Sequence, residues 1–156
     1  PGRPMILFEG HIFWRELKKR GLDPDRYVAG NENILYPKWE KGHYYGGMKE
    51  YERLEKAWEI HKEAADASTS WGMFQVMGFN YAMCGYGSVE EMVKDMCVGE
   101  DKQLEAFARF VKLAKLQSYL EQKDWVGFAR RYNGPGYARN QYDKKLEGAY
   151  RKFTKE

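Results

Sequence analysis

The sequence predicts a mainly α-helical fold with one long irregular loop or small β element. Apolar residues recur at three- and four-residue steps in several segments, which is the spacing of one face of a helix. Glycine and proline gather in residues 22–47, where no period is sustained. The 156 residues, 43% hydrophobic and 31% charged, suffice for one globular core. We therefore expect residues 1–156 to form a single domain.

The N-terminal segment joins an apolar run to a helix. Residues 5–8 are all apolar, and Glu9 follows them directly. After Gly10, the apolar positions among residues 12–17 predict a short amphipathic helix that ends at Gly21. Glu9 thus lies at the junction between the apolar run and the helix.

The irregular segment, residues 22–47, is rich in aromatic side chains. A structureless segment of this length within a compact domain is usually functional. Tyrosine and tryptophan combine a stacking face with a polar group, which suits sugar rings, although an aromatic-rich core is an equally good explanation. The aromatic residues that favour a groove-lining role are Tyr27, Tyr36, Trp39, Tyr44 and Tyr45.

Helices are also predicted along the rest of the chain. Residues 48–67 carry one apolar face, which includes His61, and a structural role is favoured for this histidine over a ligand role. Ser88 and Glu91 have the spacing of a capping box. Further predicted helices are the one that Ser88 begins and Gly99 ends, one through residues 104–114, one over residues 125–132 capped by Asp124, and one marked by Tyr142, Leu146, Ala149 and Phe153.

Composition excludes several classes of function. The net charge of +3 favours anionic polymers, but basic and acidic residues alternate and no nucleic-acid motif is present. Cys84 and Cys97 lack metal-ligand spacing, so we expect no metal and read them as buried free thiols, with a disulfide as the alternative outside the cytosol. No stretch has the length of a membrane span or the form of a signal peptide.

Glu9 is the best candidate for a catalytic carboxyl group. Glycosidases use a carboxylic acid to protonate the leaving oxygen and often a second carboxylate across the scissile bond. Desolvation raises the pKa of a carboxyl group, and Glu9 follows an apolar run. The alternative is a helix cap or an ion-pair partner of Arg15 or His11.

Two other segments carry polar groups that a simple core does not require. Gln75 interrupts an apolar run in residues 68–78, where its amide needs hydrogen-bond partners or a ligand. Tyr132 and Asn133 precede a Gly-Pro-Gly turn at residues 134–136, which offers a phenol and an amide at one corner. The alternative for each segment, favoured when it is taken by itself, is a simple helix terminus.

These segments carry a resemblance to known enzymes. Residues 72–75 resemble the Gly-Leu-Met-Gln element of goose-type lysozymes and lytic transglycosylases, and residues 132–136 resemble their Tyr-Asn-x-Gly element. Over nearly the whole chain, residues 7–13, 67–80 and 128–137 are similar to the N-acetylmuramidase domain of bacteriophage endolysins.

The resemblance implies a lysozyme-like helical domain with a cleft for a peptidoglycan strand. The implied reaction is hydrolysis of the bond between N-acetylmuramic acid and N-acetylglucosamine, without metal or cofactor. A monomer, made in the bacterial host cytoplasm and acting on the cell wall, is the implied setting. A lytic transglycosylase and a non-catalytic glycan-binding module remain the alternatives.

The resemblance also assigns roles to individual residues. Glu9 is expected to be a catalytic carboxylate and Tyr132 to hydrogen-bond the catalytic carboxyl group, while Asn133 fixes the corner. The family's general acid lies in a Glu-Ser-Gly element just before the counterpart of Gly2-Arg3-Pro4, so we expect it in an N-terminal segment upstream of Pro1, with Glu9 as the second carboxylate. The remaining substrate-binding candidates are Ser70, Trp71 and Gln75.

Overall fold

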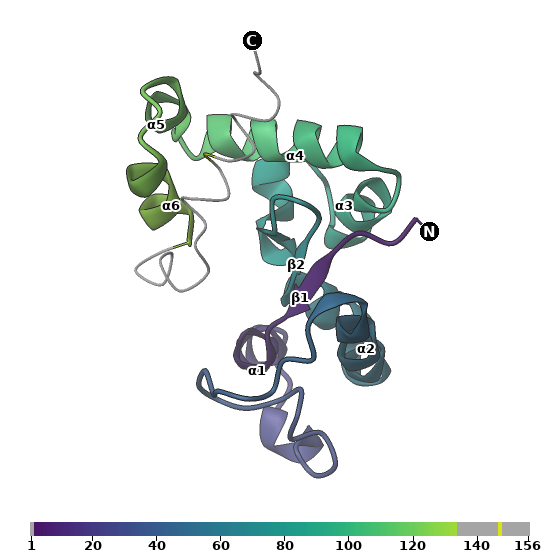
Figure 1. Cartoon of the computed structure of the whole chain (residues 1–156). Coiled ribbons are helices and arrows are strands. Elements are labelled where there is room, and N and C mark those ends of the chain that lie inside the picture. Colours follow the sequence, from purple (N-terminus) through teal and green to yellow (C-terminus); the bar gives the residue numbers. More distant parts are fainter. Residues whose placement is uncertain (1, 134–146, 148–156) are drawn as a thin grey trace. The chain divides into compact units, whose positions relative to one another are not determined.

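The computed structural model describes residues 2–133 and residue 147, and the chain divides into two compact units, Pro1–Phe110 and Val111–Glu156 (Figure 1). The predicted mainly helical fold is confirmed, and the single domain stays a prediction. The strands are β1 (Ile6–Phe8), β2 (Thr69–Trp71) and β3 (Val76–Met77). The helices are α1 (Gly10–Lys19), α2 (Glu50–Ala67), α3 (Val89–Met96), α4 (Glu100–Leu113), α5 (Gln117–Glu121) and α6 (Trp125–Asn133), with 3₁₀ helices η1 (Pro24–Tyr27), η2 (Gly47–Lys49) and η3 (Gly78–Cys84).

The three strands form one small antiparallel sheet in the order β1-β2-β3. Ile6 pairs with Trp71 and Phe8 with Thr69. Ile6 and Phe8 point to the same face of the sheet, because side chains alternate along a strand, and both are buried. The predicted small β element is thereby confirmed, and the apolar run before Glu9 is its first strand.

Helix α1 packs beside α2 and begins directly after β1 (Figure 1). Phe13 and Leu17 are buried on one face of α1, as the spacing predicted, and Gly21 follows the helix with φ +80°. Arg20 links the two helices, since its guanidinium lies 2.8 Å from the carboxylates of both Glu16 and Glu63.

Helix α2 confirms the helix predicted within residues 48–67 but contains a kink at His61. The backbone of His61 is extended (φ −164°, ψ 106°), and its Nδ1 accepts a hydrogen bond of 3.1 Å from the N–H of Ala64. The imidazole therefore caps the second part of the helix in the manner of an N-cap side chain. The structural role predicted for His61 is confirmed.

Two predicted caps are present. The Ser88 hydroxyl accepts from the N–H of Glu91 at the start of α3, and the Glu91 carboxylate accepts from the N–H of Gly87 rather than that of Ser88. In α6, Asp124 accepts from the N–H of Gly127. The last predicted helix, over residues 142–153, lies outside the described residues apart from helical Glu147.

Both cysteines are free thiols, but only one matches its predicted environment. Cys84 is buried, and its carbonyl oxygen accepts from the Arg109 side chain. Cys97 is exposed, because it follows α3 at the surface, so the prediction that it is buried is wrong. Within residues 2–133 and 147, no helix combines the length and apolar character that crossing a membrane requires.

A fully buried ion pair lies along the edge of β1 that does not pair with β2. Glu50 and Arg53 occupy positions i and i+3 of α2, with their charged groups 2.8 Å apart and 0% of either side chain exposed. Arg53 also donates to the carbonyl oxygens of Phe8 and Asn33 and to the hydroxyl of Tyr36. The guanidinium thus ties β1 to the irregular segment.

The carboxylate of Glu50 also connects β1 to the irregular segment. One carboxylate oxygen accepts from the N–H of Phe8 at 3.0 Å. The other accepts from the N–H groups of Tyr45 and Gly46, at 2.7 and 3.1 Å. The buried pair therefore satisfies backbone groups that no regular ladder or helix supplies with partners.

Removing one member of this pair should destabilise the fold strongly. Arg53→Met leaves the Glu50 carboxylate buried without its counter-charge, and we expect a loss of about 3–5 kcal/mol in the free energy of unfolding. Urea unfolding followed by circular dichroism measures it. Lys94→Met is the matched control, since Lys94 pairs with Glu90 at 4.0 Å with both side chains about three-quarters exposed, and should cost less than about 1 kcal/mol. Equal losses in the two variants would contradict the assignment.

Candidate active site

Glu9 occupies the junction between β1 and α1. Its backbone is extended (φ −110°, ψ 102°), its N–H donates to the carbonyl oxygen of Ser68, and its own carbonyl accepts from Phe13. The side chain makes no capping hydrogen bond with α1. Its carboxylate instead accepts a hydrogen bond from the hydroxyl of Tyr44 in the irregular segment. Glu9 is thus aimed away from the helix that it precedes.

The sheet places Ser70 on the same side as Glu9. Leu7 and Glu9 point to the face opposite the buried Ile6 and Phe8, because side chains alternate along an extended chain. Ser70 pairs with Leu7 in register and therefore points to this second face. The sheet separates a core face from a face that carries the candidate polar groups.

Gln75 lies in the turn between β2 and β3 in the left-handed region, with φ +50°. Its Oε1 accepts from the Ser70 hydroxyl at 2.7 Å. Its Nε2 donates to the carbonyl oxygens of Gly72 at 2.8 Å and Met5 at 3.2 Å. The amide that needed partners therefore finds them within the protein and fixes the β2–β3 turn against the segment before β1. The structure brings Ser70 and Gln75 together, and their contact with substrate remains a prediction.

The prediction that Trp71 binds substrate requires correction. Trp71 is 1% exposed, and its indole N–H donates to the carbonyl oxygen of Asp66 at 3.0 Å. The residue pairs with Ile6 and points to the core face of the sheet. An indole enclosed in this way offers no face to a sugar, so Trp71 is a core residue.

Tyr132 and Asn133 end α6 in the second compact unit. The Tyr132 ring is stacked on Phe128, with ring centroids 5.5 Å apart. The Gly-Pro-Gly turn that follows lies outside the described residues. The substrate-binding roles of Tyr132 and Asn133 remain predictions.

The phenol that binds Glu9 in the structure is Tyr44, a contact that sequence reasoning missed. The sequence placed Tyr44 in an aromatic loop but gave no means of pairing it with a residue 35 positions earlier. The Tyr44 hydroxyl in turn accepts from the indole N–H of Trp39 at 3.0 Å. A hydrogen-bonded chain thus runs from Trp39 through Tyr44 to Glu9.

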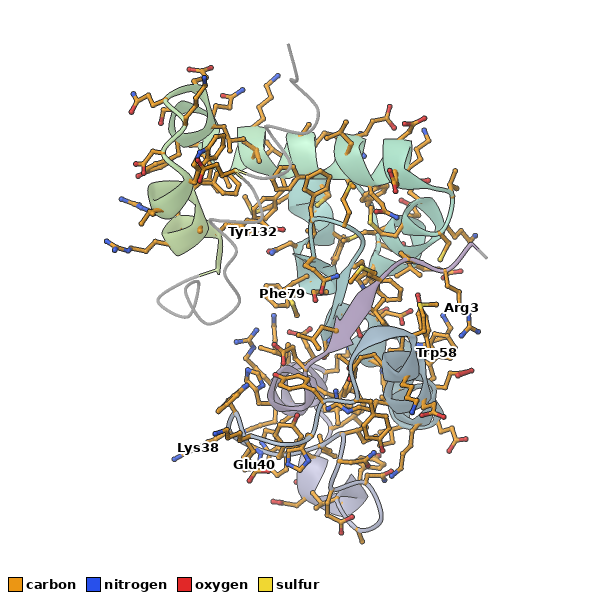
Figure 2. All side chains as sticks on the ribbon, viewed as in Figure 1. Arg3, Lys38, Glu40, Trp58, Phe79 and Tyr132 are labelled. Atoms are coloured by element: carbon orange, nitrogen blue, oxygen red, sulfur yellow. The ribbon has the colours of Figure 1, made fainter. Side chains whose placement is uncertain are left out.

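The rest of the irregular segment is held by similar side-chain contacts. Tyr36 and His43 stack with ring centroids 4.4 Å apart, and the Asn33 amide donates to the Tyr45 hydroxyl at 2.9 Å. Trp39 and Tyr45 are 42% and 48% exposed. Charged residues of the same segment, such as Lys38, project into solvent (Figure 2). The loop therefore presents aromatic surface near the carboxylate.

The environment of Glu9 raises its pKa above the ordinary glutamate value. Burial is the largest cause, because desolvation penalises the ionised form. The hydrogen bond from Tyr44 and the charge of Arg53 oppose this rise, and the charge of Glu50 adds to it. Burial and the Glu9 carboxylate also raise the pKa of Tyr44, which keeps the phenol protonated as a donor.

The chain is similar to known proteins over nearly its whole length. The chain matches the protein family described as Muramidase, N-acetylmuramidase, over residues 1–154. The chain belongs to the N-acetylmuramidase family. It is also similar to the crystal structure of the Burkholderia AP3 phage endolysin, with 42% identity, a TM-score of 0.81 and coverage of 99% of this chain. The chain spans 58% of the length of that endolysin chain. A search of curated proteins found no match.

These matches confirm the resemblance to the N-acetylmuramidase domain of bacteriophage endolysins that was drawn from the sequence motifs. They favour neither the transglycosylase nor the binding-module alternative. Membership also covers both compact units, since the match runs through residue 154.

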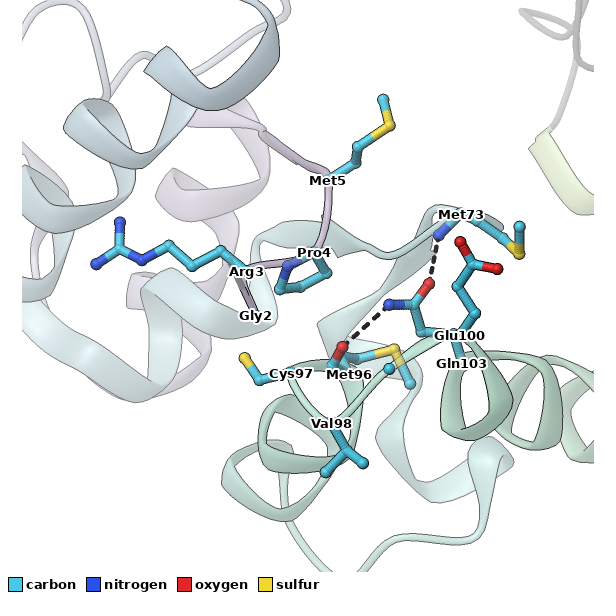
Figure 3. A pocket seen from close by; sticks show the side chains of 11 residues that line it. Gly2, Arg3, Pro4, Met5, Met73, Met96, Cys97, Val98, Glu100 and Gln103 are labelled. Carbon is cyan, nitrogen blue, oxygen red and sulfur yellow. Dashed lines mark hydrogen bonds between the residues drawn. The ribbon is translucent and has the colours of Figure 1, made fainter.

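The muramidase also has a pocket of about 410 Å³ away from the Glu9 carboxylate. It is lined by the segment before β1, the β2–β3 turn and the start of α4. The Gln103 amide spans one wall, accepting from the N–H of Met73 and donating to the carbonyl oxygen of Met96 (Figure 3). Glu9 is not among the lining residues, so this pocket does not contain the candidate carboxylate.

Gly10 is required beside the candidate carboxylate. A Cβ atom there would lie 2.5 Å from the Tyr36 ring and 2.9 Å from the carbonyl oxygen of Ile34. Gly10→Ala should therefore displace the irregular segment from α1, with a cost of about 1–3 kcal/mol in stability and a loss of lytic activity. Thermal unfolding and a turbidity assay measure both. Gly87→Ala is the control, because the nearest contact there is the flexible Glu91 side chain at 3.3 Å; comparable losses in both variants would refute the interpretation.

Proposed function

We propose that this muramidase hydrolyses the bond between N-acetylmuramic acid and N-acetylglucosamine in peptidoglycan, with Glu9 acting as an ionised catalytic carboxylate. The observation that carries the proposal is the state of Glu9. It is partly buried at the end of β1, has a raised pKa, and makes no cap with α1. A base is most effective when its pKa approaches the working pH, so this shift suits a carboxylate that activates water or stabilises positive charge.

Its hydrogen bonding supports the ionised role over that of general acid. The Tyr44 phenol donates to Glu9, and a donor stabilises the charged form of its acceptor. Arg53 favours the same form through its charge. The general acid of the reaction is then a different carboxyl group, in keeping with the two-carboxylate chemistry of glycosidases.

The surface around Glu9 supports a glycan as the ligand. Trp39 and Tyr45 expose aromatic surface on the irregular segment, and aromatic side chains suit the apolar faces of sugar rings. We assign Ser70 and Gln75 to the wall of the cleft, since they share the Glu9 side of the sheet, and we keep Tyr132 and Asn133 as substrate-binding residues on their motif. The net charge of +3 favours the anionic cell wall.

The biological setting follows from the same proposal. The enzyme would act as a monomer on the cell wall, with the glycan strand as its partner, after synthesis in the cytoplasm of the bacterial host. Neither nucleic acid nor membrane insertion is part of this function, and the reaction needs no metal or cofactor. Mass spectrometry of digested peptidoglycan tests the reaction type. Hydrolysis leaves reducing ends, whereas products lighter by one water would identify a transglycosylase.

Glu9→Gln should abolish most of the activity while the fold is kept. The amide preserves the size of the side chain and its acceptor for Tyr44 but can neither ionise nor take up a proton. We expect kcat to fall by about 10²–10⁴-fold, the contribution typical of a general acid or base. Peptidoglycan turnover measured from released reducing ends gives the value, with Glu90→Gln on exposed α3 as the control. Unchanged activity and an unchanged pH profile in Glu9→Gln would remove Glu9 from the catalytic machinery.

The same variant should not lose stability at neutral pH. The folded chain holds the Glu9 proton to a higher pH than the unfolded chain, since burial raises this pKa above 4.5. The free energy of unfolding therefore falls as the pH rises from the unfolded pKa through the folded one, and the ionised group is destabilising above that window. Glu9→Gln removes this loss, so the variant should be at least as stable as wild type near pH 7.

Urea unfolding at about pH 4 and pH 7 measures the effect. The advantage of Glu9→Gln should be present at pH 7 and shrink at pH 4, where wild-type Glu9 is protonated as well. Glu90→Gln, at an exposed position, should show no such dependence. A stability loss confined to pH 7 in Glu9→Gln would mean that ionised Glu9 is a structural ion-pair partner instead.

A further inference from the structure

We propose that Trp39 and Tyr44 form a directional hydrogen-bond relay that positions the Glu9 carboxylate for the reaction and holds it as an acceptor. This inference rests on the proposed catalytic role of Glu9 and names two positioning residues for it. Neither residue is part of the motifs that identify the family, and both lie in a segment without regular secondary structure beyond short 3₁₀ turns.

The direction of the relay follows from the chemistry of its members. An indole N–H is a donor only, so the 3.0 Å contact makes the Tyr44 oxygen the acceptor. Tyr44 has a single hydroxyl proton, and Glu9 is the acceptor that receives it. The Glu9 oxygen that faces Tyr44 therefore accepts and carries no proton of its own. Trp39 matters because it fixes the orientation of the phenol.

The buried ion pair between Glu50 and Arg53 holds the segment that carries Tyr44 in place. The N–H groups of Tyr45 and Gly46, directly after Tyr44, donate to Glu50. The Arg53 guanidinium lies 5.4 Å from the centre of the Tyr44 ring, in cation–π range. The backbone and the ring of Tyr44 are thus both held, which leaves its hydroxyl at one place beside Glu9.

The relay also acts on the pKa of the desolvated Glu9 carboxyl group. Burial is the largest cause that raises the pKa of Glu9, and the Tyr44 hydrogen bond is the largest effect in the opposite direction. The titratable and charged groups that face Glu9 are Tyr44 and Tyr36 from the loop and Arg53 and Glu50 from α2. Loss of the Tyr44 donor should therefore raise the pKa of Glu9 further and move the acidic limb of the pH–activity profile to higher pH.

The test compares three single variants on the full chain. Tyr44→Phe removes the donor to Glu9, and we expect kcat to fall about 10- to 100-fold, as for one hydrogen bond to a charged group, with KM unchanged and the acidic limb shifted upward. Trp39→Phe keeps an aromatic ring but removes the indole donor, and should shift the limb in the same direction by a smaller amount. Tyr86→Phe is the matched control, because the Tyr86 hydroxyl donates to the carboxylate of Asp95 at 2.8 Å and not to Glu9.

A second measurement does not depend on turnover. Carbon-13 NMR of the side-chain carboxyl groups gives the pKa of Glu9 directly, with Glu9→Gln assigning its signal. A higher Glu9 pKa in Tyr44→Phe and Trp39→Phe, but not in Tyr86→Phe, supports the relay. An unmoved pKa in the first two variants overturns it. If Tyr44→Phe unfolds, Trp39→Phe decides the question alone.

The two proposals fail in different ways. Retention of full activity by Glu9→Gln would overturn the proposed function. Loss of activity in Glu9→Gln, together with a Tyr44→Phe variant that behaves like Tyr86→Phe, would overturn the relay and leave the function standing. In the double variant, Tyr44→Phe should add no further loss to Glu9→Gln, since Tyr44 acts through Glu9; additive losses would show that Tyr44 acts by another route.

Discussion

The buried ion pair between Glu50 and Arg53 is the interaction on which the rest of the first compact unit depends. Two charges removed from water are stable only when every oxygen and N–H finds a partner, and here those partners are backbone groups of β1 and of the irregular loop. The strand that leads into Glu9 and the loop that carries Tyr44 are therefore tied to the same two side chains. The spacing i, i+3 on α2 lets one helical turn supply both.

The pair also sets the electrostatics of the candidate site. Arg53 and Glu50 act on Glu9 with opposite signs, so their charges cancel in part and burial determines the direction of the pKa shift. A lone buried arginine beside Glu9 would instead hold the carboxyl group at low pKa, as a simple ion-pair partner. The Glu50–Arg53 pair thus connects β1 to the loop, and the pKa of Glu9 is still raised. A raised carboxyl pKa is the property that acid–base chemistry requires.

Local pattern predicted much of the fold, and long-range pairing accounts for what it missed. The Ser88 and Asp124 caps and the helix after Glu9 depend on residues within a few positions of one another, so their spacing is visible in the sequence. The strand before Glu9 has three residues, too few to show alternation. The contact of Tyr44 with Glu9 joins distant segments, and nothing in a tryptophan's identity distinguishes the buried Trp71 from the half-exposed indole of the loop.

The irregular loop explains why the carboxylate of Glu50 is buried. A segment without helix or strand leaves backbone N–H groups without regular partners, and those of Tyr45 and Gly46 donate to the carboxylate of Glu50. An anionic acceptor at Glu50 meets that need, and its burial in turn requires Arg53 as counter-charge. The adjacent Tyr44 is then held with its hydroxyl at Glu9. Glu50 and Arg53 thus have two roles. They stabilise a loop without regular structure, and they set the environment of Glu9.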